Sequence, residues 1–328
     1  MGLSPLVEVE RIFNDYIEVC VSPQYGFSIL SIIDKNSGAE ALWQRQPFHP
    51  TPPSREIGVG GSASETHFFD RFLGGWFEMF PVVGFPDADD TVHHLHGEVV
   101  QLPWEVTDIT KVSISAEVDC LRTPFHLTRR LELVDDVLHI FESVTNLGRA
   151  SCSFSWGHHP CFSRSTFAGG HIQLSVDKAT VPAPPFDPLH AILVPGQTFQ
   201  WPNAPLIAGG ELNVAEIPMN PDFRHDHICL SPDKGELSIS SPILERSLSV
   251  EWEIERFPHI LIWLDFQGQN GFPMYGCTDT FAIEFSDNPG RSMDDARQEN
   301  ALSELQPCQE ISTAIALRWH KFDPSNSI

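Results

Sequence analysis

The chain has 328 residues, of which 44 are acidic and 20 are basic, so its formal net charge is −24. A charge of this sign and size repels nucleic acid and anionic lipid, which argues against both as partners and favours a neutral ligand. Apolar residues make up 41% and charged residues 20% of the sequence, as in ordinary globular proteins. We see no apolar run long enough to span a bilayer.

The cysteines and the first residues bear on the compartment. The seven cysteines are scattered, odd in number and lack a Cys-x-x-Cys pair, so we expect neither a disulfide framework nor a zinc ribbon. They are Cys20, Cys120, Cys152, Cys161, Cys229, Cys277 and Cys308. The start of the sequence lacks the basic residues and apolar run of a secretory signal. Together these features predict a cytoplasmic protein.

Strict alternation of apolar and polar residues predicts half-buried antiparallel strands. The segments predicted in this way are, in chain order, residues 21–34, 112–118, 129–146, 172–176 and 247–254. The first is broken by a turn at Tyr25-Gly26, and 129–146 is a hairpin whose arms meet at Asp135-Asp136. Helical periodicity is nearly absent. The one predicted helix spans 292–305, where Ser292 is placed to cap it and Asp295 stands at capping-box spacing.

Many short strands without interleaved helices predict an all-β fold, a large antiparallel β-sandwich formed by a single domain of residues 1–328. Two proline-rich stretches, 47–53 and 181–205, interrupt the pattern. Both keep aromatic residues, namely Phe48, Phe186, Phe199 and Trp201. Long ordered loops of this kind either form the rim or lid of a binding site or cover the edge of a sheet, and the sequence leaves both options open.

Glu284 is the first candidate for chemistry. In an extended segment 280–285, Phe281, Ile283 and Phe285 share one face, whereas Glu284 shares the other with the smaller Thr280 and Ala282. The bulky face suits the core, and the opposite face leaves room for a ligand. Apolar neighbours desolvate the carboxylate, favour its neutral form and make it a stronger base at neutral pH. An exposed or salt-bridged glutamate is the structural alternative.

His159 is the second candidate. It precedes Pro160, which biases it towards an extended conformation, and it follows Gly157-His158. Adjacent residues of a strand face opposite ways, so only one of His158 and His159 faces a given site. The other is expected to be a structural histidine, and the sequence does not decide which.

His96 lies in a histidine-rich run, residues 92–98. If this run is a strand, His94, His96 and Glu98 project on one side, which is the spacing of a β-strand metal site or of the first cupin motif. A cupin would place its glutamate farther on and add a histidine from a second motif, which the sequence lacks. We therefore expect no metal and no other cofactor.

Taken together, the motifs resemble the aldose 1-epimerase (galactose mutarotase-like) family over about residues 10–320. The resemblance rests on the order and spacing of several short segments: Gly74-Gly75-Trp76 with Phe80-Pro81, His96-Gly97 with Pro103-Trp104, Gly157-His158-His159-Pro160 with Phe162, Phe257-Pro258-His259-Ile260-Leu261-Ile262-Trp263, Phe281-Ala282-Ile283-Glu284, and Leu305-Gln306-Pro307. Characterised mutarotases usually carry Asn-His-x-Tyr-Phe where this chain has His158-His159-Pro160-Cys161-Phe162. That departure concerns the substrate more than the geometry of the site.

The resemblance implies a supersandwich with a sugar-binding cleft on one sheet and an enzyme that interconverts α and β anomers of a sugar. It assigns Glu284 as general base, His159 as general acid and His96 as a second imidazole near the ring oxygen. It also implies Arg71 and Asp226 as contacts to sugar hydroxyls. Trp76 and Trp263 are suited to stack on the C–H face of a sugar.

Two alternatives stay open. One is a non-catalytic carbohydrate-binding protein on the same fold, since a fold does not fix a function. The other is a metal-dependent, cupin-like isomerase or oxygenase that uses the histidines of 92–98. The presence of both His159 and Glu284 favours the isomerase.

Overall fold

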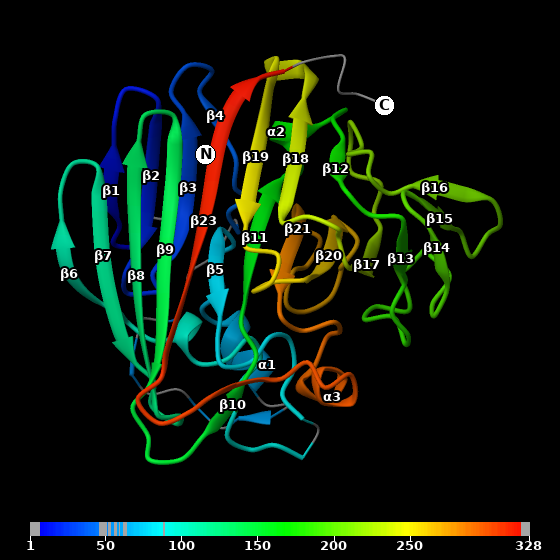
Figure 1. Ribbon diagram of the computed structural model, residues 1–328. Coiled ribbons are helices and arrows are strands. Elements are labelled where there is room, and N and C mark those ends of the chain that lie inside the picture. Colours follow the sequence, from blue (N-terminus) through cyan, green and yellow to red (C-terminus); the bar gives the residue numbers. More distant parts are fainter. Residues whose placement is uncertain are drawn as a thin grey trace.

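Two large antiparallel sheets dominate the computed structural model, which describes residues 7–45, 51, 54–55, 58, 60–61, 64–87 and 89–322 (Figure 1). The larger sheet has eleven strands. Ten follow one another in the order β1 (Glu10–Phe13), β2 (Ile17–Ser22), β3 (Ser28–Asp34), β5 (Trp76–Met79), β11 (Gly157–Ser163), β21 (Asp279–Ser286), β20 (His259–Phe266), β17 (His225–Leu230), β13 (Lys178–Thr180) and β14 (Thr198–Gln200), and β4 (Ala39–Glu40) pairs with β3.

The second sheet has eight strands. Their order is β12 (Ile172–Leu174), β18 (Glu236–Ser241), β19 (Arg246–Trp252), β23 (Glu310–Lys321), β9 (Val137–Asn146), β8 (Phe125–Val134), β7 (Ser113–Asp119) and β6 (Glu105–Ile109). The remaining elements are short: the pair β10 (Cys152–Phe154) and β22 (Ser303–Leu305), the pair β15 (Asn203–Pro205) and β16 (Glu211–Asn213), the helices α1 (Ser64–Phe69), α2 (Arg164–Phe167) and α3 (Met293–Gln298), and the 3₁₀ turns η2 (Val99–Gln101) and η3 (Pro242–Leu244).

The main apolar core lies between the sheets. Phe281, Ile283 and Phe285 of β21 are fully buried in it, and the Phe285 ring stacks on Trp252 of the second sheet with ring centroids 4.8 Å apart. Burying a side chain of this size contributes roughly 1.5–3 kcal/mol. The alternation predicted for 280–285 is therefore confirmed, and it turns Glu284 away from the second sheet.

The predicted strands are confirmed with small shifts of their ends. Residues 21–34 form parts of β2 and β3, 112–118 match β7, 172–176 match β12, 247–254 match β19, and 129–146 form the hairpin of β8 and β9. Asp135 in the hairpin turn has a φ of 51°, the left-handed conformation that Asp tolerates better than most residues. The stretch 47–53 lies mostly outside the described residues.

The helix predicted over 292–305 is confirmed at its start and wrong at its end. Ser292 caps α3 by accepting the backbone N–H of Asp295 at 3.1 Å, and the Asp295 carboxylate accepts the N–H of Arg291 at 2.7 Å. The helix ends at Gln298, and Asn300 takes a left-handed φ of 54°. Residues Ser303–Leu305 then pair with β10 as a strand, so tertiary pairing overrides the helical pattern.

Among the described residues, no helix combines the length and the apolarity that crossing a membrane requires.

Candidate functional site

The candidate site lies on the face of the larger sheet that points away from the second sheet. His159 on β11 and Glu284 on β21 both project from this outer face, because each is out of phase with core residues of its own strand. The two strands are direct antiparallel neighbours, with Cys161 paired to Ala282. Neighbouring strands lie about 4.8 Å apart, which brings the two side chains within reach of each other.

His159 and Glu284 form a direct contact. The Nε2 atom of His159 lies 3.1 Å from Oε1 of Glu284, and both residues are buried, at 5% and 3% exposure. Burial raises the pKa of Glu284 well above its ordinary value of 4.5. Burial, aided by nearby His96, lowers the pKa of His159 well below 6.5. Both shifts favour the neutral forms, so the site resists holding two separate charges and holds one transferable proton between the two groups.

His96 reaches the His159–Glu284 pair from a turn. Its φ is 58° and that of Gly97 is 78°. A Cβ at Gly97 would lie 2.1 Å from the carbonyl oxygen of Phe80, so only glycine fits this close approach. The turn brings the His96 ring to within 5.3 Å of the His159 ring, measured between centroids. In the described part of the chain, the buried Nδ1 of His96 has no hydrogen-bond partner, which leaves it available to a ligand.

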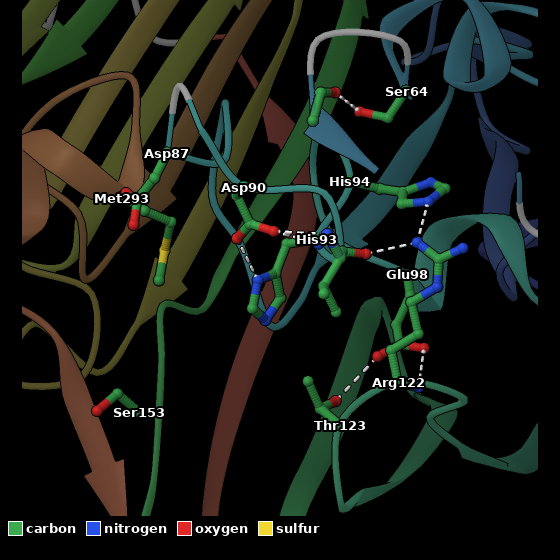
Figure 2. A network of polar contacts seen from close by, with 12 residues as sticks. Ser64, Asp87, Asp90, His93, His94, Glu98, Arg122, Thr123, Ser153 and Met293 are labelled. Atoms are coloured by element: carbon green, nitrogen blue, oxygen red, sulfur yellow. Dashed lines mark hydrogen bonds and ion pairs between the residues drawn. The ribbon is translucent and has the colours of Figure 1, made fainter. Parts of the chain in front are cut away.

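The alternative in which 92–98 forms a strand with three ligands on one side does not match the structure. These residues form bends and turns instead, and Figure 2 shows His94 and Glu98 engaged with partners in the segment that contains Arg122 and Thr123. His94 contacts Arg122 Nη1 at 2.6 Å and Gln101 at 3.1 Å. Glu98 accepts the hydroxyl of Thr123 at 2.9 Å and the backbone N–H groups of residues 121 and 122. Within the described ranges, no three His, Cys, Asp or Glu side chains are grouped to hold a metal ion.

On the outer face of the larger sheet, His159 and Glu284 face a cavity that opens to solvent. Its empty space is about 670 Å³ when the part open to solvent is included. The cavity combines aromatic and apolar walls with several polar groups. Its polar lining residues are Glu65, His96, His159, His225, His227, Gln269, Glu284 and Arg291.

Phe186, from the proline-rich stretch 181–205, lines this cavity. The centroid of its ring lies 4.6 Å from that of the His227 ring, on which it stacks. The Arg291 guanidinium lies over the Phe186 ring, 5.1 Å from its centroid. Part of this stretch therefore forms a rim, as one of the two predicted options had it. Phe199 and Trp201 pack against the main core instead.

Of the predicted contact residues, Trp263 lines the cavity, with its ring centroid 5.8 Å from that of His159. Trp76 does not: it is fully buried on the inner face of the sheet, where its Nε1 donates to His158 at 3.4 Å. The alternation of β5 explains this placement, because it gives the outer face to Phe77 and Met79.

Arg71 and Asp226 also lie away from the cavity. Arg71 follows α1, contacts His67 and lines a separate small hollow with Tyr25. Asp226 points to the inner side of β17 and accepts the backbone N–H groups of Ile192 and Leu193 at 3.1 Å each. In this structure neither is placed to contact a ligand beside His159.

The sequence prediction missed His225 and His227, which flank Asp226 and project from the outer face. His227 pairs directly with Trp263 on β20, and the Nδ1 of His225 lies 3.5 Å from the carboxylate of Asp187. Alternation along β17 places both histidines on the face opposite Asp226. The pairing of His227 with Trp263, which only the structure shows, decides that the face with the histidines lines the cavity.

His158 faces the inside of the sandwich and is fully buried, with its Nε2 2.9 Å from Glu142 Oε2. His159, rather than His158, therefore faces the cavity.

His96 should make the protein sensitive to acid. Burial lowers its pKa from 6.5 to about 3, so below pH 6.5 the unfolded chain binds a proton that the folded chain does not. The free energy of unfolding should then fall as the pH drops from 6.5 towards 3, by about 1.4 kcal/mol per pH unit for one proton. Urea titrations at a series of pH values measure this change, and we expect the free energy of unfolding of His96→Phe to depend less steeply on pH over this range. An equal dependence on pH in the two proteins would contradict the lowered pKa of His96.

Comparison with known proteins supports the fold. The sequence matches no protein-family model. A structure from Escherichia coli K12, assigned provisionally as an aldose 1-epimerase, superposes with a TM-score of 0.69 at 16% identity over 96% of this chain and 99% of that one. A galactose mutarotase related enzyme from Lactobacillus acidophilus gives a TM-score of 0.64 at 18% identity, over 97% and 99% of the two chains.

A protein from Synechocystis sp. PCC 6803 gives a TM-score of 0.68 at 15% identity, over 98% and 99% of the chains. These matches cover nearly the whole length on both sides, while the identities are low. The protein therefore has the galactose mutarotase-like fold, a mostly β structure of large antiparallel sheets, as the sequence motifs predicted.

Proposed function

We propose that this protein is an aldose 1-epimerase, a mutarotase that interconverts the α and β anomers of a sugar by acid/base ring opening. The observation that carries the proposal is the buried His159–Glu284 pair on the floor of the cavity, with Nε2 and Oε1 3.1 Å apart. The reaction needs one group that takes a proton and one that gives a proton at two oxygens bound to the same carbon. Two functional groups this close together suit two such oxygens.

The proposed mechanism follows from the single proton of the pair. When that proton lies on His159, Glu284 is a carboxylate and takes the proton of the anomeric hydroxyl. His159 gives its Nε2 proton to the ring oxygen, the bond from C1 to the ring oxygen breaks, and C1 becomes an aldehyde carbon. Rotation about the bond between C1 and C2 and closure on the other face, with both transfers reversed, gives the other anomer. The proton count of the pair is restored.

The desolvation of the pair favours this chemistry. The lowered pKa of His159 makes its protonated form a strong acid, and the raised pKa of Glu284 makes its carboxylate a strong base. His96, with an unpartnered Nδ1, is placed to hydrogen-bond a sugar oxygen beside the pair. Trp263 and the aromatic walls offer apolar surface to the C–H face of a sugar.

Polarimetry tests the proposal. A freshly dissolved α-anomer of glucose or galactose should reach its equilibrium rotation faster with the protein than without it. Calorimetric titration of the same sugars measures whether they bind. If several aldoses bind but reach equilibrium no faster than they do without the protein, the proposal is overturned and a non-catalytic sugar-binding protein is favoured.

We expect the substrate to be uncharged. The net charge of −24 opposes anionic ligands, and Arg291 is the one Lys or Arg side chain among the described cavity-lining residues. Its guanidinium is already engaged, donating to the carbonyl oxygen of Pro184 at 3.0 Å and lying over Phe186. Glucose and galactose should therefore be turned over with a higher kcat/KM than their 6-phosphates. A strong preference for the phosphates in the same polarimetric assay would count against this prediction.

A further inference from the structure

Two polar side chains lie within hydrogen-bonding distance of the ring nitrogens of His159, and they have different roles. Nε2 faces Glu284, whereas Nδ1 lies 3.3 Å from the sulfur of Cys161, two residues along the same strand. The rest of the ring is enclosed by aromatic side chains. Phe77 stacks on it at 4.5 Å and Trp263 approaches at 5.8 Å. Within the described part of the chain, the Cys161 thiol is thus the side chain that hydrogen-bonds to Nδ1.

The position of the Nδ1 proton matters for a pair that shares one transferable proton. If Nδ1 carries a hydrogen, Nε2 is free to accept a proton from the Glu284 carboxyl group or to hold it as imidazolium. If Nδ1 is bare, a neutral His159 carries its hydrogen on Nε2. It then has no proton to give from that atom, since giving it would leave an imidazolate. The working tautomer is therefore the one with hydrogen on Nδ1, and the partner of Nδ1 selects the tautomer.

We propose that Cys161 is a positioning residue whose sulfur accepts the Nδ1–H of His159 and so keeps Nε2 as the atom that exchanges protons with Glu284 and the substrate. This inference rests on the proposed function for its consequence in catalysis, but the tautomer itself does not depend on any activity. It gives a role to the residue at which this chain departs from the Tyr of Asn-His-x-Tyr-Phe.

The surroundings of Cys161 favour an accepting thiol over a nucleophile. The residue is fully buried, packs in an apolar cluster with Phe77 and Trp263, and is not among the residues that line the cavity. Burial, with a smaller contribution from Glu284, raises the pKa of the Cys161 thiol well above its ordinary value, so it keeps its proton. The S–H group has its own acceptor in the carbonyl oxygen of His159, 4.0 Å from the sulfur.

A thiol is also a weak acceptor. It orients the Nδ1–H group without stabilising the imidazolium as strongly as a carboxylate would. His159 is therefore held in the working tautomer and yet remains a strong acid when protonated. A carboxylate at this position would achieve the first effect and lose the second.

Nuclear magnetic resonance of isotope-labelled histidine tests the tautomer at neutral pH, and the spectrum of His159→Gln identifies the signal of His159. In the wild type we expect hydrogen on Nδ1. Cys161→Val fills similar space without an acceptor and should shift His159 towards the Nε2–H tautomer, since Nε2–H then donates to Glu284. Cys161→Ser keeps an acceptor and should keep hydrogen on Nδ1. Cys20→Val, at another buried cysteine on β2, is the matched control and should leave the signal unchanged.

A purely structural role for Cys161 would change stability and leave the tautomer alone. An Nε2–H tautomer in the wild type, or an unchanged Nδ1–H tautomer in Cys161→Val, would overturn the proposal. In the mutarotation assay, Cys161→Val should lose about tenfold in kcat with KM nearly unchanged, which is the low end of the loss when a partner that orients a metal-bound histidine is removed. Cys161→Ser should stay near the wild type. An inactive wild type with the expected tautomer shift would reject the proposed function and support the role of Cys161.

Discussion

Glu284→Gln is expected to lower the rate of mutarotation by ~10²-fold or more, which is the typical effect of removing a general base. The amide keeps the shape of the side chain and its hydrogen-bonding capacity, but it cannot take a proton from the anomeric hydroxyl. Calorimetric affinity for the sugar should stay near that of the wild type. Polarimetry with the α-anomer measures the rate, and Glu251→Gln, exposed on β19 of the other sheet, is the matched control.

The same substitution should not weaken the fold. Burial raises the pKa of Glu284 above 4.5, so the folded chain holds this proton more tightly than the unfolded chain does. The stability from this group is therefore fully present below pH 4.5 and is lost as the pH rises through the raised pKa. A neutral glutamine avoids that loss, so above pH 4.5 the variant should be at least as stable to urea as the wild type. An unchanged rate in a stable variant would remove Glu284 from the catalytic pair.

Local patterns in the sequence were enough to predict most of the fold and the residues at the centre of the site. Alternation is a property of each strand, so it predicted the hairpin of β8 and β9 and the outward direction of Glu284 without any knowledge of the partners. The order of short motifs then predicted the galactose mutarotase-like fold. His96, His159 and Glu284 come from three distant segments, and the structure brings all three together at one cavity.

The features that local patterns missed depend on contacts between distant segments. The run 92–98 could be read as a strand only on its own, because the approach of Gly97 to the Phe80 carbonyl turns the chain there, and His94 and Glu98 have other partners. The family resemblance implied Asp226 as a sugar contact, yet its strand neighbours His225 and His227 line the cavity instead. Only the pairing of β17 with β20 distinguishes the two possibilities, and no single segment contains that information.

Behind β11, on the inner face of the larger sheet, lies a buried ionic cluster whose disruption should strongly destabilise the protein. Arg129 Nε lies 2.8 Å from Glu142 Oε1, and Glu142 Oε2 lies 2.9 Å from His158 Nε2, with all three side chains at most 1% exposed. Burial by itself would raise the pKa of Glu142, but His158 and Arg129 together hold it below its ordinary value. Burial, aided by Glu142, raises the pKa of neighbouring Glu78 well above its ordinary value, so Glu78 stays neutral. The positive charge of Arg129 is then balanced by the negative charge of Glu142.

Glu142→Gln should cost about 3–5 kcal/mol in the free energy of unfolding, because it leaves the Arg129 guanidinium buried without a counter-charge. The amide oxygen still accepts from His158, so the loss reports on the charge rather than on that hydrogen bond. The double variant Arg129→Met with Glu142→Gln removes both charges and should recover most of the loss, since a buried ion pair contributes little beyond its own desolvation. Urea titrations of the two single variants and the double variant measure the coupling. A double variant as unstable as the sum of the singles would show that the cluster stabilises the sandwich by something other than charge balance.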